Sequence, residues 1–160
     1  KAALERTNGP TALIFTRQAL PHQDRTPEQV RAIARGGYVL LDCGDDPEAI
    51  IIATGSEVQL AMGAAKHLNG QGRRVRVVSM PSVDVFDAQD AVYRESVLPA
   101  KVTRRAVVEA GVTAPWYKYA GPRGTVIGID CFGESGPPET IFQHFGFTAE
   151  RVATAVAALF

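Results

Sequence analysis

Apolar residues alternate along the chain between short continuous runs and longer repeats with helical spacing. The run 50–52 contains three isoleucines and is too short for a helix, which is typical of a strand buried on both faces of a parallel sheet. Gly55 ends this run, and Ser56 and Gln59 have the spacing of a capping box, which predicts a helix beginning at Ser56. The helix has one apolar stripe, formed by Val58, Ala61, Met62, Ala65 and Leu68. A second β-rich run at 75–79 completes a strand–helix–strand unit.

The same patterns predict the remaining elements. Further strands are expected at residues 11–16, 38–41, 105–109 and 125–129. Further helices are expected at residues 26–35, 84–97, 114–120, 137–145 and 148–159. Thr26 and Gln29 form a second capping box, and Asp87 is the expected cap of the helix 84–97. Strands that alternate with helices predict a three-layer α/β domain.

The connection between the strand 38–41 and the run 50–52 is too short to cross over a sheet. The two strands therefore either pair as a hairpin or lie antiparallel with one other strand between them. Both arrangements predict a mixed sheet. The first 25 residues differ from this pattern, because the apolar strand 11–16 has no partner strand nearby in the sequence and residues 21–25 are polar and turn-like. The chain also begins at Lys1, in what resembles the last turns of a helix, so we expect it to be a piece of a longer protein.

Composition excludes several classes of partner. The 160 residues are 46% hydrophobic, enough for a core, and contain 17 basic and 17 acidic side chains without a long run of one sign. Binding to nucleic acid or to an anionic membrane is therefore not expected. Cys43 and Cys131 lie in apolar contexts without a C-x-x-C pair, which predicts buried thiols in a reducing compartment. With no membrane span or signal peptide recognised, a soluble cytoplasmic protein is expected.

Two glycine turns invite a functional interpretation. The turn Gly55–Ser56 precedes a helix, where free N–H groups can bind phosphate, but Glu57 in the first turn would compete with an anion and ordinary capping is favoured. The loop 132–138 (FGESGPP) is similar to a nucleophile elbow, yet it lacks the G-x-S-x-G spacing, so Ser135 is expected to cap the next helix.

Other polar and aromatic groups favour structural roles. Asp42, Asp45 and Asp46 have turn chemistry rather than calcium-loop spacing. The three histidines are His22, His67 and His144, and they are too far apart in the sequence to suggest a zinc site. Phe142, Phe145 and Phe147 are expected to pack in the core rather than around a cofactor. The aromatic residues at 116–119 are expected to serve packing or an interface rather than stacking on a ligand.

Arg17 is the strongest candidate for a binding residue. It follows the predicted strand 11–16, at the end of a strand where α/β sheets place ligand-binding side chains. Its forked guanidinium suits a phosphate or carboxylate. A solvated surface arginine is the alternative.

Eight segments, in this order, resemble the carboxyl-terminal part of transketolase: GPTALIFTRQALP, RGGYVLLDC, IIIATGSEVQLA, VVSMPSVDVFDAQD, YRESVLP, VEAG, WYKY and FGESGPPE. The resemblance covers essentially the whole chain, and YRESVLP, MPS-x-D-x-F and FGES are its most specific motifs. It implies that residues 1–25 are the tail of a middle, pyrimidine-binding domain, that 26–37 form a linker with a short helix, and that 38–160 form the C-terminal domain. It further implies a five-stranded mixed sheet of order 1-3-2-4-5, with the first strand antiparallel.

The resemblance also implies a function. Transketolases form homodimers that transfer a two-carbon ketol unit from a ketose phosphate to an aldose phosphate, using thiamine diphosphate and Mg²⁺ or Ca²⁺. The residues that hold the cofactor and the metal are expected to precede Lys1, so this chain alone is expected to be inactive. One family site falls inside it, because Arg17 corresponds to the arginine of the S-R-Q motif that binds the sugar phosphate, with Thr16 in place of serine. A free-standing interaction or regulatory domain of the same fold, and a small-ligand domain that uses either glycine turn, are the alternatives.

Overall fold

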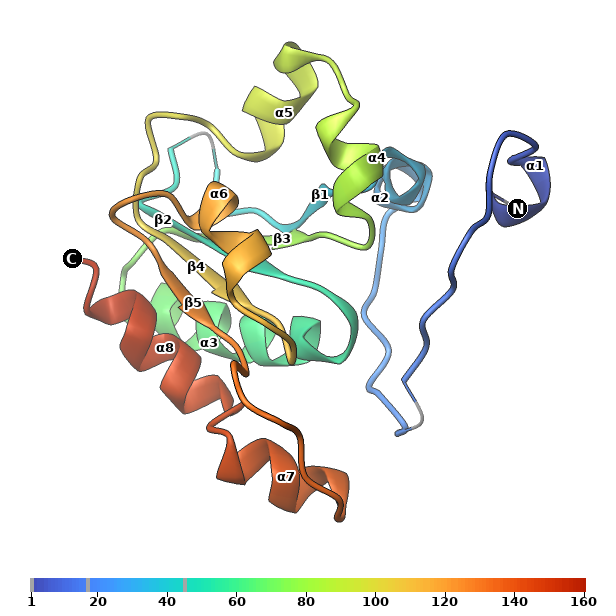
Figure 1. Cartoon of the computed structure of the whole chain (residues 1–160). Coiled ribbons are helices and arrows are strands. Elements are labelled where there is room, and N and C mark those ends of the chain that lie inside the picture. Colours follow the sequence, from blue (N-terminus) through green and yellow to red (C-terminus); the bar gives the residue numbers. More distant parts are fainter. Residues whose placement is uncertain (1, 17, 45) are drawn as a thin grey trace.

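A five-stranded mixed sheet forms the centre of the protein in a computed structural model, which describes residues 2–16, 18–44 and 46–160 (Figure 1). The strands lie in the order β1-β3-β2-β4-β5, as expected. β1 is antiparallel to β3, and the other neighbouring strands are parallel. The bounds are β1 (Tyr38–Leu41), β2 (Ala49–Ala53), β3 (Val75–Ser79), β4 (Arg105–Val108) and β5 (Thr125–Ile127).

β2 is the central strand, and all five of its residues are fully buried. Ile51 packs in the cluster that contains the apolar side chains of α3 and α8, whereas Ile50 and Ile52 pack in the cluster on the opposite face. Because successive side chains of a strand point to opposite faces, an uninterrupted isoleucine run fills both layers of core at once.

The helices cover the two faces of the sheet unequally (Figure 1). α3 (Val58–Gly70) and α8 (Ala149–Ala157) pack together on one face, where Gly63 allows the backbone of α3 to approach Ala149 closely. The other face carries shorter helices, α4 (Val83–Asp87), α5 (Ala91–Val97), η3 (Ala114–Trp116) and α6 (Tyr117–Ala120). α7 (Pro138–His144) follows β5 and extends beyond the sheet.

α2 (Pro27–Ala32) and η1 (Ile33–Arg35) lead into β1. The predicted capping box is present, because the Thr26 hydroxyl accepts from the Gln29 N–H and the Gln29 side chain accepts from the Thr26 N–H. The Gln29 amide also donates to the carbonyl oxygens of Val39 and Leu40 in β1, at 3.0 and 2.9 Å. Gly36 ends the helical segment with a φ of 83°, a left-handed conformation that favours glycine.

Three predicted helix caps are wrong. A 3₁₀ turn, η2 (Gly55–Glu57), precedes α3, and the Ser56 hydroxyl donates to the Glu57 carboxylate instead of capping. The segment 84–97 is two helices, because Asp90 rather than Asp87 accepts from a backbone N–H and starts α5. α7 begins at Pro138 without a side-chain cap, so Ser135 does not cap it.

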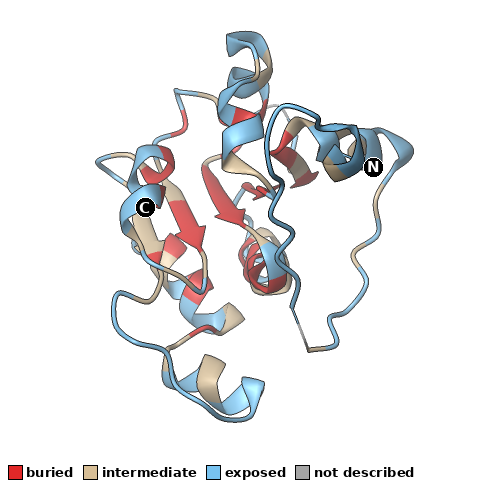
Figure 2. Ribbon diagram, turned by 45° about the vertical axis from the view of Figure 1, so that its right-hand side comes forward, coloured by how far each residue is buried: buried red, intermediate tan, exposed pale blue. Residues whose placement is uncertain are grey.

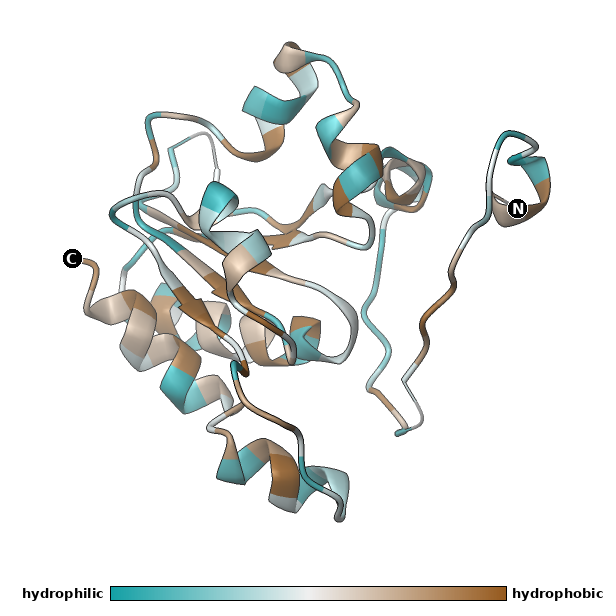
Figure 3. Ribbon diagram, in the orientation of Figure 1, coloured by the Kyte–Doolittle hydropathy of each residue, from teal (hydrophilic) through white to brown (hydrophobic). Residues whose placement is uncertain are grey.

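The predicted strand 11–16 is also wrong, because these residues form no strand and are exposed. Leu13, Ile14 and Phe15 expose 62%, 94% and 80% of their surface. A strand gains its stability from neighbours, and none of the five strands of the sheet pairs with this segment. Figures 2 and 3 show the consequence, an arm after α1 (Ala2–Glu5) that is both exposed and apolar.

The cysteine prediction is only partly correct. Both thiols are free, but Cys131 is exposed and Cys43 is half-buried. Cys131 lies past the end of β5, in a loop that the helices do not cover. No helix in the described part of the chain combines the length and apolar character needed to cross a bilayer.

Candidate functional site

Arg17, the binding residue expected from the sequence, lies outside the described residues, as does Asp45. The chain after Arg17 approaches the domain, because Gln18 and Ala19 line a cavity of about 490 Å³ together with residues of α3, α7 and α8. The following residues line a second cavity, of about 430 Å³, at the carboxyl ends of β2 and β3.

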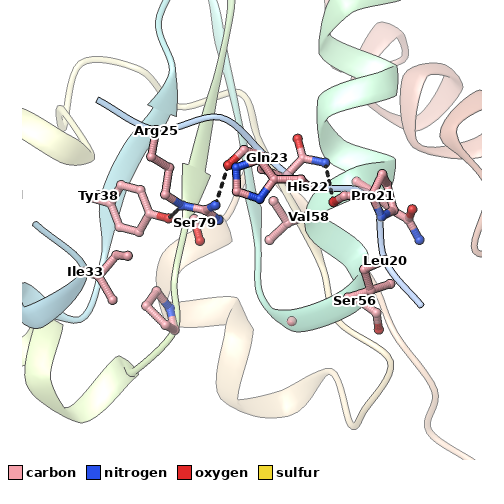
Figure 4. Close-up of a pocket in the computed structure, with 13 residues that line it drawn as sticks. Leu20, Pro21, His22, Gln23, Arg25, Ile33, Tyr38, Ser56, Val58 and Ser79 are labelled. Carbon is pink, nitrogen blue, oxygen red and sulfur yellow. Dashed lines mark hydrogen bonds between the residues drawn. The ribbon is translucent and has the colours of Figure 1, made fainter. Parts of the chain in front are cut away.

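This second cavity combines a polar side and an apolar side (Figure 4). Its polar groups include Arg25, Ser56 and Ser79, and its apolar wall includes Leu20 and Val58. The segment 20–25 forms one wall, and the η2 turn and the end of β3 form another. Crevices outside the carboxyl ends of strands are where open α/β sheets bind ligands.

Arg25 is held in place by two hydrogen bonds. Its Nε donates to the Tyr38 hydroxyl at 2.7 Å and its Nη1 donates to the Gln23 carbonyl oxygen at 2.6 Å (Figure 4). Tyr38 is buried at the start of β1, so the contact ties residues 20–25 to the sheet. Neither bond occupies the third guanidinium nitrogen, Nη2.

Ser79 and Ser56 are two largely buried residues that line the same cavity. Ser79 is the last residue of β3 and is 6% exposed, and Ser56 is 7% exposed. The Ser56 hydroxyl is bound to Glu57, whereas the Ser79 side chain makes no hydrogen bond to another described residue. Because Ser79 lines the cavity and its hydroxyl oxygen is not among the buried unpartnered atoms, this hydroxyl group is open to the cavity.

A pair of carboxyl groups lies next to the cavity, at the carboxyl ends of β2 and β4. Ala53 pairs with Val108, so Glu57 in η2 and Glu109 after β4 leave the sheet from neighbouring strands. Oε2 of Glu109 is buried without a hydrogen bond to any described residue. Burial and the nearby charge of Glu57 raise the pKa of Glu109 to about 7. Burial also raises the pKa of Glu57, although hydrogen bonds from Ser56 and the Ala110 N–H act in the opposite direction.

Sequence reasoning misses this carboxyl pair. The sequence suggests that Glu57 is a competitor for anions in the first helical turn, but its side chain is 3% exposed and does not line the cavity. Glu57 follows the predicted strand 50–52 and Glu109 is the last residue of the predicted strand 105–109, and that signal identifies the pair only once β2 and β4 are known to be neighbours.

The other candidates have structural partners or are isolated. Asp42 accepts from the buried Arg76 at 3.0 Å, which fixes the turn after β1. His22 forms an exposed ion pair with Asp24, and among residues 2–16, 18–44 and 46–160 no three His, Cys, Asp or Glu side chains form a potential metal site. The loop 132–138 is exposed throughout, including Phe132 at 98%.

Comparison with known proteins identifies the family. Residues 36–148 match the family model described as the transketolase-like TK C-terminal domain. Transketolase 2 of Escherichia coli is 57% identical over 152 residues, which is 95% of this chain and 23% of that protein. A structure of Pichia stipitis transketolase in complex with sedoheptulose-7-phosphate superposes with a TM-score of 0.71 and 41% identity, covering 81% of this chain and 19% of that one.

A second solved structure represents a shorter relative. The split-gene transketolase described as an inactive β4 tetramer has a TM-score of 0.68 and 25% identity, covering 89% of this chain and 47% of that one. This chain spans about a quarter of the length of the curated relatives that it matches. The family model, the close relatives and the structural match together show that the chain belongs to the transketolase family, in which it matches the C-terminal domain.

Proposed function

We propose that this chain acts as the C-terminal part of a transketolase, which transfers a two-carbon ketol unit from a ketose phosphate to an aldose phosphate. The match of residues 36–148 to the C-terminal domain of this family carries the proposal. Residues 38–160 would be that domain, residues 26–37 a linker, and residues 1–25 the tail of the pyrimidine-binding domain. The role of the C-terminal domain would be to support the fold and the homodimer of a cytoplasmic enzyme.

The described residues of this chain do not fit the cofactors of the complete enzyme. Thiamine diphosphate would need a divalent metal, and the described residues offer no cluster of metal ligands. We therefore derive no step of the reaction from thiamine diphosphate or Mg²⁺ within this chain. The solved split-gene relative is described as an inactive β4 tetramer, which supports the proposal that the reaction requires further segments of the enzyme.

Arg17 would be the one residue of this chain that contacts substrate. A guanidinium binds a phosphate group through paired, charge-assisted hydrogen bonds. The complex of the Pichia stipitis relative with sedoheptulose-7-phosphate supports sugar phosphates as the substrate class. Loss of such a contact costs about 1.5–3 kcal/mol, or roughly 10-fold to 150-fold in binding.

The test is an Arg17→Ala substitution in the complete enzyme. We expect KM to rise for phosphorylated substrates and to change little for hydroxypyruvate, which has no phosphate group. An equal change for both substrate types would refute the phosphate contact. In a separate assay, the 160-residue chain with thiamine diphosphate, Mg²⁺ and sugar phosphates should give no ketol transfer, and turnover would refute the inactive role of the isolated chain.

A further inference from the structure

The cavity at the carboxyl ends of β2 and β3 has the composition of a ligand site that the proposed function does not use. Its volume, about 430 Å³, lies within the range that small metabolites occupy in proteins. Its polar groups come from three separate segments, the segment 20–25, the η2 turn and the end of β3. Polar groups that several segments place around one cavity can fix the orientation of a bound ligand.

The charge and the donors of the cavity favour an anion. Arg25 is fixed by Tyr38 and Gln23 and retains a guanidinium nitrogen that neither of them uses. η2 and α3 run continuously from Gly55 to Gly70, so the first N–H groups of this helical unit lack intrahelical partners and carry the positive end of the helix dipole.

Ser79 supplies a second and independent indication of a ligand. Its side chain is more than nine-tenths buried, lines the cavity and has no hydrogen bond to a described residue. The hydroxyl group can be reached from the cavity, so a ligand oxygen there can supply its hydrogen-bond partner.

The acidic groups nearby do not oppose an anion directly. Glu57 points toward the Ala110 N–H and Glu109 and is not part of the cavity lining. Asp24 is exposed and forms its ion pair with His22, at 3.6 Å. The cavity lining itself contains no aspartate or glutamate among the described residues.

We propose that this cavity binds a small phosphate-bearing molecule, whose phosphate group contacts Arg25, Ser79 and the N-terminus of the η2–α3 helical unit. The apolar side of the cavity, at Leu20 and Val58, would contact the body of the molecule. Phosphate fits this set of partners because helix N-termini, hydroxyl groups and guanidinium groups are its usual partners in proteins. The proposed site does not include Arg17.

The experiment is a titration of the ¹⁵N-labelled chain with inorganic phosphate, followed by NMR at constant ionic strength. We expect saturable shifts of the amide signals of Gly55, Ser56 and Ser79. Glycerol phosphate should shift the signals of Leu20 and Val58 in addition, whereas glycerol should shift none of these. Shifts that rise linearly without saturation, or that chloride reproduces, would show an adventitious ion only and overturn the proposal.

Substitutions test which residues are responsible. Arg25→Ala should weaken binding at least about tenfold and Ser79→Ala about threefold or more, in line with the loss of a charged and a neutral hydrogen bond. The matched controls Arg123→Ala and Ser135→Ala alter exposed residues outside the cavity and should leave binding unchanged. Arg17→Ala should also leave it unchanged, which separates this site from the proposed substrate contact. If Arg25→Ala releases the segment 20–25, Ser79→Ala still tests the proposal, because unchanged binding in that variant overturns it.

Discussion

Glu57 and Glu109 bring two carboxyl groups together at the ends of the neighbouring parallel strands β2 and β4. The charge of Glu57 acts on Glu109, and neither pKa is lowered by a nearby Lys or Arg. Glu109 has a pKa of about 7, so near neutral pH its carboxyl group is partly protonated. Two carboxyl groups in such an arrangement titrate as a pair.

The first prediction concerns the dependence of stability on pH. The folded-state pKa of Glu109 is above its value of 4.5 in an unfolded chain, so the folded state binds more protons between pH 4.5 and 7. The free energy of unfolding should therefore fall as pH rises through this interval. Glu109→Gln removes the charge, and we expect it to stabilise the protein at pH 8 by about 1–2 kcal/mol after allowing for solvent screening, and by less at pH 5.

Urea unfolding of both proteins at pH 5 and pH 8 checks this expectation. Glu134 lies in the exposed loop before α7, so Glu134→Gln is the matched control and should change the free energy of unfolding by less than about 0.5 kcal/mol at either pH. An equal effect of Glu109→Gln at both pH values would contradict the assignment of the proton to Glu109.

The second prediction concerns the turn between η1 and β1. A Cβ at Gly36 would overlap with the Phe86 nitrogen and the Ser82 oxygen of the α4 segment, in addition to its positive φ. We expect Gly36→Ala to lower the free energy of unfolding by about 3 kcal/mol or more, because backbone strain and overpacking add.

Gly44 provides the comparison for Gly36→Ala. It has a φ of 98°, but a Cβ added there would meet no described atom within 4 Å, so Gly44→Ala should cost only the backbone strain, about 1–2 kcal/mol. Urea unfolding followed by the fluorescence of the buried Trp116 measures both. Similar losses for the two variants would show that the contact with α4 is unimportant.

The third prediction concerns the two thiols. Cys131 is exposed, whereas Cys43 is half-buried and its pKa is raised by burial and by the charge of Asp42. Because the thiolate is the reactive form, Cys131 should react with a disulfide reagent several times faster at pH 8. Cys131→Ser should leave only the slow reaction and Cys43→Ser only the fast one; equal rates in the two variants would contradict the structure.

Much of the central sheet could be predicted because its signals are local. The isoleucines of β2 identify a strand buried on both faces, and the short connection after Leu41 already requires an antiparallel β1. Thr26 and Gln29 cap α2 as their spacing predicts, since both partners lie within one helical turn.

The failures depend on partners that are distant in the sequence or on burial. Asp87 has the chemistry of a cap, but it accepts from the Tyr119 hydroxyl of α6 at 2.8 Å, which leaves capping to Asp90. Ser56 instead donates to the Glu57 carboxylate, because a buried carboxylate is costly unless it accepts hydrogen bonds. The apolar segment 13–15 has the pattern of a strand, yet strand formation requires a neighbour that local pattern cannot supply.

The candidate site shows the same limit. The Gly55–Ser56 turn is visible in the sequence, but its partners Arg25 and Ser79 come from segments that are distant on either side of it. Their convergence depends on the pairing of β2 with β3 and on the hydrogen bond from Arg25 to Tyr38. Neither follows from periodicity.

The amide of Gln29 has a consequence for how molecules of this protein meet. β1 is the outermost strand on its side of the sheet, where free carbonyl groups can recruit a strand from another molecule. By donating to the carbonyls of Val39 and Leu40, this one side chain occupies acceptors that an incoming strand would need. The same residue that starts α2 thus discourages sheet extension and aggregation along that edge.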